Sequence, residues 1–486
     1  MAHRFFNLIS KYKLDDLLVQ ISDISSRMFE QNTAVEDIPV TVSKGFLSKN
    51  GNVTLTAWGL LKISYHAIVT THDFVTMSPT FDNIIEICYE FNDYDNQVSG
   101  EVYKDNSIDE RLLFDMFGLT QEQFWFQKLH LIKEMFNRDV ELLEVIPSQI
   151  KTNINLNEII QKTTDFDMVL YRKLLLAVYA SKRINGCISI SDHFEKYDER
   201  LNRDNISKTI KSLSANYHDY RQSPLRHKYF YAKPIVQTTA NMFIAVNQYL
   251  LALKITDGVF WTIRDYFMQQ DRKASQKFTN EFGKYFERYV ENLLNHFLDP
   301  KQFIRVPEGK KKNEGRADWI IHTQKYQIIV EQKSRLLSIT LKDVHMDIQK
   351  LSEYLEEHKE GFIQLDKTTC AYSKPNKTII KLLLHYELLH MAENILKEKV
   401  MPMLSGQLKT YDNYFFIYIG DFEHLLQILH EDENIFNLII EEKIGLEKPT
   451  TGEGKEFNQI IPKFYNKRNE YINEHLNHYS NYLFKC

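Results

Sequence analysis

Two apolar segments followed by a Glu-x-Lys triplet constrain this chain more than any other feature of its sequence. Residues 315–321 (GRADWII) and 326–330 (YQIIV) are rich in Ile, Val, Tyr and Trp, and a short polar turn separates them. This pattern predicts a hairpin of two half-buried strands. Because side chains alternate between the faces of a strand, Glu331 and Lys333 are expected to share one face, and the hairpin would return Asp318 beside them.

Two carboxylates and one ammonium on a single sheet face have the chemistry of metal-assisted phosphodiester cleavage. The carboxylates can hold a divalent cation, and the ammonium lies near the attacking water and the charged phosphate. A charged pair at the end of an apolar run is costly to bury, which favours a functional role for Glu331 and Lys333. The alternative is that Asp318, Glu331 and Lys333 are surface charges on an edge hairpin.

These residues resemble the motif of the PD-(D/E)xK phosphodiesterase superfamily, whose members have the restriction-endonuclease-like fold. The resemblance rests on Asp318, on Glu331-x-Lys333 thirteen residues later, and on an upstream helix at residues 282–290 (FGKYFERYV) that carries a glutamate. Ala317 stands where the name of the motif has proline. The resemblance covers roughly the last two-fifths of the chain.

The resemblance implies a role for each motif residue. Asp318 and Glu331 would bind Mg²⁺ or Mn²⁺, the backbone carbonyl of Gln332 would add a ligand, and Glu287 on the upstream helix would complete the site or hold a second ion. Lys333 would orient or help to deprotonate the water and offset the charge that develops on the phosphate. Attack at phosphorus would leave a 5′-phosphate, and one such site cuts one strand, so duplex cleavage would need a homodimer or two successive events.

A basic segment surrounds the motif and indicates contact with nucleic acid, for which DNA is our first expectation. Residues 301–350 hold eleven Lys or Arg and six Asp or Glu, whereas the whole chain has a net charge of −5. Candidate phosphate contacts within this segment are Lys310, Lys311, Lys312 and Arg316, and Gln349 on the following helix is a further candidate for substrate contact. Neutralisation of phosphates by such a cluster gives affinity that falls with salt. The alternative is a solvated basic loop.

The segments after the motif predict an α/β fold with a central mixed sheet and helices on both sides. A helix is expected at residues 340–358, where apolar residues recur at helical spacing. Strands are expected at residues 378–385 (TIIKLLLH) and 414–419 (YFFIYI), each followed by a helix. We therefore assign residues 271–486 to a restriction-endonuclease-like domain.

The first 270 residues are expected to be mostly α-helical, with residues 1–165 forming an N-terminal domain. Helices are predicted at residues 108–117 and 121–137, with Gly118 at the break between them. Residues 166–270 read as helices and a hairpin, which could form a winged helix. Candidate DNA contacts of that module are Lys208, Lys211 and Arg221. The alternative is a helical scaffold with an exposed basic face.

Composition sets the outer limits of these interpretations. A chain of 486 residues is long enough for two or three domains. The four cysteines lie far apart and are expected to be reduced thiols of a cytoplasmic protein. No apolar segment is long enough to span a bilayer, so no membrane partner is expected.

A helical sensor joined to a nuclease would suit bacterial restriction or anti-phage defence. Two alternatives remain open at this point. In one, the nuclease fold only grips nucleic acid and is inactive. In the other, the chain is a partner-controlled subunit of a larger complex.

Overall fold

The structure is a computed structural model of the whole chain. It describes residues 4–40, 51–71, 75–102, 116–122, 131–181, 183–184, 186–307, 315–342, 348–446 and 455–482. The predicted phosphate contacts Lys310, Lys311 and Lys312 lie outside the described residues.

The C-terminal part of the described chain is built on a five-stranded mixed sheet. Its strands are β8 (Phe303–Arg305), β9 (Trp319–His322), β10 (Tyr326–Lys333), β11 (Thr378–His385) and β12 (Tyr414–Tyr418), in the order β12-β11-β10-β9-β8. Strands β8, β9 and β10 pair antiparallel, and β10, β11 and β12 pair parallel. The predictions of an α/β fold, of the hairpin and of the two later strands are confirmed.

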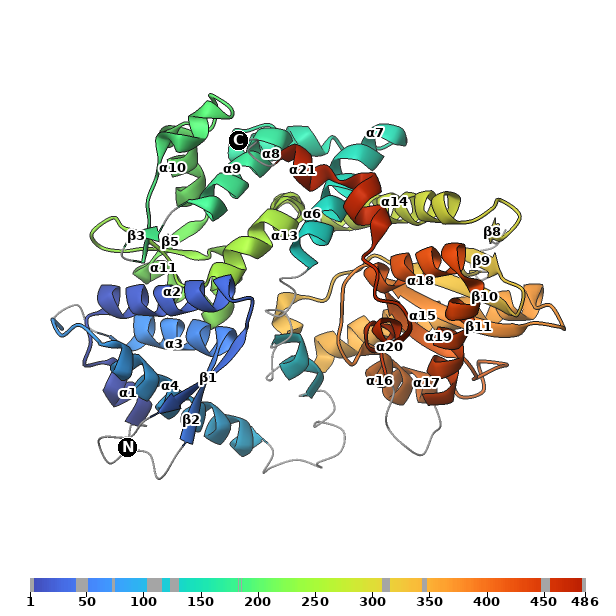
Figure 1. Cartoon of the computed structure of the whole chain (residues 1–486), viewed down its shortest axis with the longest axis horizontal. Coiled ribbons are helices and arrows are strands. Elements are labelled where there is room, and N and C mark those ends of the chain that lie inside the picture. Colours follow the sequence, from blue (N-terminus) through green and yellow to red (C-terminus); the bar gives the residue numbers. More distant parts are fainter. Residues whose placement is uncertain are drawn as a thin grey trace.

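Helices cover both faces of this sheet because its strands alternate between two cores. In β10, Ile328 and Val330 belong to the core formed with α14 (Arg272–Phe297) and α18 (Ile419–Glu431), whereas Ile329 belongs to the core formed with α15 (Ile348–Tyr372). Figure 1 shows the sheet between these helices. The side chain of Asp271 caps α14 by accepting a hydrogen bond from the Ala274 N–H at 2.7 Å.

The elements around α15 and after β11 differ from the sequence-based expectation. Described α15 continues fourteen residues beyond His358, where the predicted helix ended, and residues 339–341 form a separate 3₁₀ turn. The later elements are α16 (Ala392–Ile395), the π-helical η6 (Leu396–Val400), α17 (Met401–Met403), α19 (Glu433–Leu446), α20 (Phe457–Phe464), the π-helical η7 (Tyr471–Leu476) and α21 (His478–Tyr482).

The N-terminal part is mostly helical and has a core of its own. It comprises α1 (Arg4–Ile9), α2 (Leu14–Glu30), β1 (Val35–Val40), β2 (Gly51–Thr56), α3 (Ala57–Thr70) and α4 (Phe81–Val102). The hairpin β1–β2 was not predicted. Residues 116–122 are helical throughout, so the prediction that Gly118 breaks a helix is wrong.

The segment predicted to hold a hairpin and possibly a winged helix contributes a second mixed sheet. Its strands are β3 (Arg183–Ile184), β4 (Cys187–Ile188), β5 (Ser214–Asn216), β6 (Ile235–Gln237) and β7 (Phe243–Ala245), in the order β3-β4-β7-β6-β5. Strands β6 and β7 form the predicted hairpin. Its helical elements are η3 (Asp192–Lys196), α10 (Arg203–Ser212), α11 (Tyr217–Gln222), η4 (Arg226–Lys228) and α12 (Tyr229–Ala232). The guanidinium of Arg221 donates to the backbone carbonyls of Ile68 and Thr71, at 2.8 and 3.3 Å. These bonds tie α11 to α3, and Arg221 as a whole remains exposed.

A central group of helices joins the N-terminal part to the C-terminal sheet. It contains α6 (Ile132–Val140), η2 (Glu141–Val145), α7 (Ile146–Gln149), α8 (Leu156–Thr164), α9 (Met168–Ala180) and α13 (Gln248–Met268). Figure 1 shows α13 between the N-terminal helices and the sheet. Phe136 of α6 and Val330 of β10 belong to one continuous core. Residues 131–165, predicted as part of a separate N-terminal domain, thus pack with the C-terminal part.

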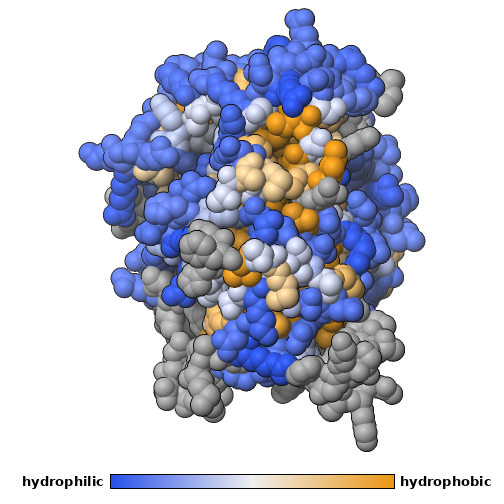
Figure 2. Space-filling model, turned by 90° about the vertical axis from the view of Figure 1, so that its left-hand side faces the viewer, coloured by the Kyte–Doolittle hydropathy of each residue, from blue (hydrophilic) through white to orange (hydrophobic). Residues whose placement is uncertain are grey.

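The outer face of the N-terminal part shows some apolar surface but gives no functional assignment. Figure 2 views this face and shows apolar side chains gathered across its upper half among polar ones. Exposed apolar residues in and beside the second mixed sheet include Ile184 and Met242. Individually exposed apolar side chains are ordinary on protein surfaces. No helix in the described residues combines the length and the apolar character needed to cross a membrane.

Candidate active site

The hairpin β9–β10 places Asp318 directly opposite Glu331. Trp319 pairs with Val330 in the antiparallel register, so the next residue on each strand forms the next pair. The backbone N–H of Asp318 donates to the carbonyl of Val330 at 3.0 Å. The two carboxyl groups lie within hydrogen-bonding reach of each other. The backbone N–H of Gln332 donates to Asp318 Oδ2 at 2.8 Å and fixes its orientation.

Lys333 shares the face of these carboxylates, as side-chain alternation requires. Its ammonium donates to Glu331 Oε1 at 2.6 Å and to the side-chain oxygen of Gln364 at 3.3 Å. The other carboxylate oxygen of Glu331, Oε2, is buried and has no hydrogen-bond partner. The structure therefore brings Asp318, Glu331 and Lys333 together, and one ammonium faces two carboxylates.

Burial and neighbouring charges raise the pKa of both carboxyl groups. Burial, followed by the nearby charge of Asp318, raises the pKa of Glu331 from 4.5 to about 8 against the opposing effect of Lys333. Burial also raises the pKa of Asp318 from 3.8 to about 6, although the Gln332 N–H and Lys333 lower it and Glu287 raises it. A buried carboxyl pair of this kind is stabilised by protons or by added positive charge.

One face of α15 holds the motif residues in place. A side chain at Gly361 would put its Cβ 2.8 Å from Leu383 Cδ1 and 3.1 Å from Lys333 Cε, so only glycine lets the helix come this close. The Thr368 hydroxyl accepts a hydrogen bond from the Ala317 N–H at 2.8 Å. Gln364 lies between them on the same face and contacts Lys333.

Gln364 was missed by the sequence analysis, which named Gln349 instead. Gln349 lies in the first turn of α15 and is exposed, fifteen residues before Gln364. At the rise of an α-helix this spacing is about 22 Å. The signal that could have found Gln364 is the i, i+3, i+7 spacing of Gly361, Gln364 and Thr368, but it is visible only when the helix is extended past His358.

In addition to burial, the charge of Glu287 reaches Asp318 and raises its pKa, while the Glu287 side chain is engaged with β8. It forms an ion pair with Arg305 of β8, and Arg305 is paired in register with Trp319. Trp319 packs in the core on the α14 side of the sheet, whereas Asp318 alternates with it and faces α15. Among the described residues, no three His, Cys, Asp or Glu side chains converge as a metal site.

The side chains of Gln332 and Arg316 contact other parts of the protein, and the metal-binding role of the Gln332 backbone carbonyl stays a prediction. The side-chain oxygen of Gln332 accepts a hydrogen bond from the Trp319 indole at 3.4 Å, so this residue braces both strands. The guanidinium of Arg316 donates to the hydroxyl of Tyr372 at 2.9 Å and lies over its ring, at the far end of α15. These contacts fix Arg316 two residues before Asp318, close to the candidate site.

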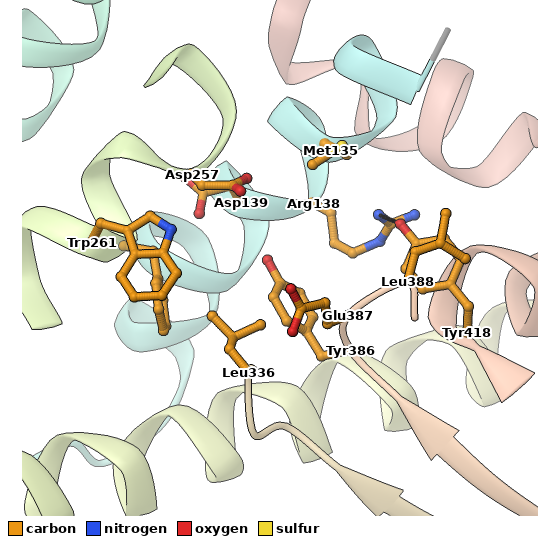
Figure 3. Close-up of a pocket in the computed structure, with 11 residues that line it drawn as sticks. Met135, Arg138, Asp139, Asp257, Trp261, Leu336, Tyr386, Glu387, Leu388 and Tyr418 are labelled. Atoms are coloured by element: carbon orange, nitrogen blue, oxygen red, sulfur yellow. Dashed lines mark hydrogen bonds between the residues drawn. The ribbon is translucent and has the colours of Figure 1, made fainter. Parts of the chain in front are cut away.

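A small pocket lies just beyond the ends of β10 and β11. Leu336, Tyr386 and Glu387 line it from the sheet side, and Figure 3 shows them facing Asp139 and Trp261 of the central helices. Its volume of about 40 Å³ leaves room for one or two water molecules but not for a substrate.

Comparison of the chain with protein-family models, with curated proteins and with solved structures gives no match. The chemistry of the site therefore rests on its own geometry.

Proposed function

We propose that this chain is a metal-dependent nuclease that hydrolyses phosphodiester bonds, with DNA as the expected substrate and a restriction-endonuclease-like fold in its C-terminal part. One observation carries the proposal. Two carboxylates, the buried Glu331 and the partly buried Asp318, face each other across β9 and β10, and the ammonium of Lys333 lies 2.6 Å from Glu331 Oε1. The mixed sheet with helices on both faces supports the proposed fold.

The residues fit a hard divalent cation such as Mg²⁺ or Mn²⁺. Such ions prefer carboxylate oxygens, and Glu331 offers a buried oxygen, Oε2, that has no protein partner. The cation would be held by Asp318 and Glu331, and when bound it would supply Lewis-acid stabilisation of charge on the phosphate. Two protein carboxylates are enough for Mg²⁺, which usually keeps several waters and also takes oxygens from the substrate.

Each residue of the group has a separate task in this proposal. The Gln332 N–H orients Asp318, and Gly361 allows α15 to approach so that Gln364 holds Lys333. The ammonium of Lys333 would donate to the water or to a phosphate oxygen and stabilise the charge that develops there. Burial of Glu331 strengthens its interaction with Lys333, whose side chain is partly exposed and can reach a ligand.

A second candidate function is nucleic-acid binding without cleavage. The observation that favours it is that Glu287 is paired with Arg305 and that, in the part of the chain that the structure describes, no third acid converges with Asp318 and Glu331. In this case the basic residues near the site would grip phosphates, and the carboxylates would have no catalytic role.

A cleavage assay separates the two candidates. Plasmid, linear and single-stranded DNA and RNA would be incubated with Mg²⁺ or Mn²⁺ and with wild type, Asp318→Asn or Lys333→Met. Lys325→Met is the matched control, because Lys325 lies at the turn of the same hairpin and pairs with Glu441 on the surface. We expect metal-dependent cleavage that Lys325→Met keeps and that Lys333→Met lowers roughly 100- to 1,000-fold.

The same proteins would be tested for salt-dependent DNA binding. Binding without cleavage in any metal, with wild type and Asp318→Asn equal, would support the binding-only function. Equal cleavage by wild type and both site variants would exclude the assigned site.

A further inference from the structure

Beside Lys333, on the face of the sheet that α15 covers, the structure buries polar atoms for which the described residues offer no hydrogen-bond partner. Neither ring nitrogen of His385, the last residue of β11, has such a partner, and His385 is fully buried. His358 Nε2 and the hydroxyl of Tyr354, both on α15 and both buried, also lack a partner among these residues. Unpartnered buried polar atoms lower stability, so native structures keep few of them, and a group of them in one place indicates a use.

His358 and His385 are neutral, and each offers a hydrogen-bond acceptor. His358 Nδ1 lies 2.7 Å from the backbone carbonyl oxygen of Tyr354, and because a carbonyl only accepts, this nitrogen carries the proton. Burial lowers the pKa of His358 to about 4, so its Nε2 keeps a free lone pair. Burial also lowers the pKa of His385 well below 6.5, and the positive charge of Lys333 adds to this effect. One nitrogen of His385 is therefore an acceptor that carries no charge.

Two aromatic rings hold the His385 imidazole in a fixed plane. It stacks on His358, with 4.8 Å between the ring centroids and 8° between the planes. The ring of Phe416 on β12 lies 4.1 Å from it, centroid to centroid, at an interplanar angle of 31°. Nearly parallel rings at these distances contact each other through their faces, so the nitrogens on the edge of the imidazole stay free to meet a donor.

His385 lies directly beside Lys333. The two residues are partners in the parallel register of β10 and β11, and neighbouring strands lie about 4.8 Å apart. A Cβ on Gly361 would lie 3.1 Å from Lys333 Cε, so Lys333 points to α15. Leu383, two residues before His385 on β11, belongs to the core formed with α15, so His385 points to the same helix. The imidazole and the lysine side chain therefore lie on one face of the sheet, under one helix.

Lys333 needs an acceptor besides those that it uses in the structure. An ammonium has three N–H groups, and two of them donate to Glu331 Oε1 at 2.6 Å and to the side-chain oxygen of Gln364 at 3.3 Å. Under the proposed function Glu331 also holds a cation, whose positive charge repels the ammonium from this carboxylate. His385 offers a replacement that does not compete for the ion, because Mg²⁺ prefers oxygen ligands to imidazole nitrogen.

We propose that His385 is a positioning residue for Lys333: its unprotonated ring nitrogen accepts a hydrogen bond from the ammonium when Glu331 holds a cation, and this bond keeps another N–H directed toward the substrate. The inference rests on the proposed nuclease function. In this role His385 touches neither the substrate nor the cation, and its contribution is to hold Lys333 in place.

Nitrogen-15 NMR of the histidine side chains in the full chain tests the contact directly. The His385 signals would be identified by their loss in His385→Phe, and wild type and Lys333→Met would be compared in EDTA and in saturating Mg²⁺. We expect Mg²⁺ to shift one ring nitrogen of His385 toward the hydrogen-bonded acceptor position in wild type, with a smaller shift or none in Lys333→Met. An equal shift in both proteins, or no shift in wild type at Mg²⁺ concentrations that raise its melting temperature, would overturn the inference.

Stability and cleavage should respond differently to His385→Phe. The change removes two unpartnered buried nitrogens and keeps a ring against His358 and Phe416, so the melting temperature should not fall. The value of kcat should fall roughly 10- to 100-fold with KM unchanged, which is the size expected for one hydrogen bond to a charged group. His385→Asn keeps an acceptor oxygen and should retain more of the wild-type kcat than His385→Phe does.

The control variant is His322→Phe. His322 lies at the turn end of the hairpin, where it pairs with Gln327, and its Nδ1 is also buried without a partner among the described residues. This variant should cleave like wild type. Equal kcat for wild type and His385→Phe would overturn the inference and leave the proposed function standing. Absence of both cleavage and Mg²⁺-dependent stabilisation in wild type would instead reject the proposed function, and this inference with it.

Discussion

Two buried glutamates, Glu423 and Glu331, each lie beside a basic side chain but differ in how completely they are hydrogen-bonded. We call the residues around Glu423 the complete group and those around Glu331 the incomplete group. Around Glu423, Arg138 donates to both carboxylate oxygens at 2.8 Å, Tyr289 donates to one at 2.7 Å and Asn469 to the other at 2.5 Å. Each oxygen of Glu423 therefore accepts two hydrogen bonds. Around Glu331, Lys333 donates to one oxygen, and the other has no partner.

The difference separates a fully hydrogen-bonded structural charge from a charge that we propose serves chemistry. Burying any carboxylate costs desolvation, and the group at Glu423 offsets that cost with an opposite charge and complete hydrogen bonding. The group at Glu331 leaves the cost partly uncompensated, and the rest of the fold must stabilise it. Strongly perturbed carboxyls of this kind are concentrated at functional sites.

The largest effect on stability should come from removing Arg138 from the complete group around Glu423. Arg138→Met removes the cation and leaves Glu423 buried without its main partner, which should lower the free energy of unfolding by about 3–5 kcal/mol. Urea denaturation followed by circular dichroism would measure this loss. Arg288→Met is the control, because Arg288 forms a partly exposed pair with Glu291 within α14, and its loss should be at most about 1 kcal/mol. A loss for Arg138→Met no larger than that of the control would contradict the structural role.

The sequence predicted the incomplete group but not the complete one, for a physical reason. Asp318, Glu331 and Lys333 lie on one hairpin, where alternation along each strand and a short turn determine which side chains meet. Arg138 and Glu423 are 285 positions apart and meet only through tertiary packing. No local pattern in the sequence predicts such a contact.

The same limit applies to the residues around the motif. The resemblance implied a helix containing Glu287, which α14 confirms, but the contact of Glu287 with Arg305 depends on how α14 packs. The resemblance also named Gln349, which stays a candidate for substrate contact in the first turn of α15. The continuation of α15 to Tyr372 brings Gln364, a residue with no special local signal, to Lys333.

The second effect is the gain in stability that Mg²⁺ should give by binding Asp318 and Glu331 of the incomplete group. With Mg²⁺ at about 100 times its dissociation constant, wild type should gain about 2.7 kcal/mol in free energy of unfolding, because the ion binds only the folded site. Glu331→Gln should lose this gain while keeping its stability without metal, since one of two like charges has been removed. Thermal unfolding with EDTA and with a Mg²⁺ series would measure both quantities. A metal-dependent gain that persists in Glu331→Gln would place the ion elsewhere.

A smaller effect is the pH dependence without metal. The pKa of Glu331 is raised in the folded chain from 4.5 to about 8, so folding favours its protonated form. Its contribution to stability is fully present below about pH 4.5 and is lost as the pH rises toward 8. The free energy of unfolding of wild type should therefore fall relative to Glu331→Gln between pH 5 and pH 8 in EDTA, as measured by urea denaturation at several pH values.

Metal affinity should change in the opposite direction over the same interval. The cation needs ionised carboxylates, so Mg²⁺ binding should strengthen from pH 6 to pH 8 and release protons to the buffer. A stability difference between wild type and Glu331→Gln that does not vary with pH would show that Glu331 titrates normally.

The smallest effect tests how closely α15 supports the incomplete group. Gly361→Ala adds a Cβ 2.8 Å from Leu383 Cδ1 and 3.1 Å from Lys333 Cε, so overpacking should outweigh the gain in helix propensity and cost about 1 kcal/mol. Gly445→Ala in α19 meets nothing within 4 Å and should instead be neutral or stabilising by up to about 1 kcal/mol. The added Cβ would displace the ends of both side chains, and Lys333 would shift relative to Glu331 and Gln364. Cleavage should then fall more in Gly361→Ala than its loss of stability explains, and equal cleavage by both glycine variants would show that the position of Lys333 does not depend on this contact.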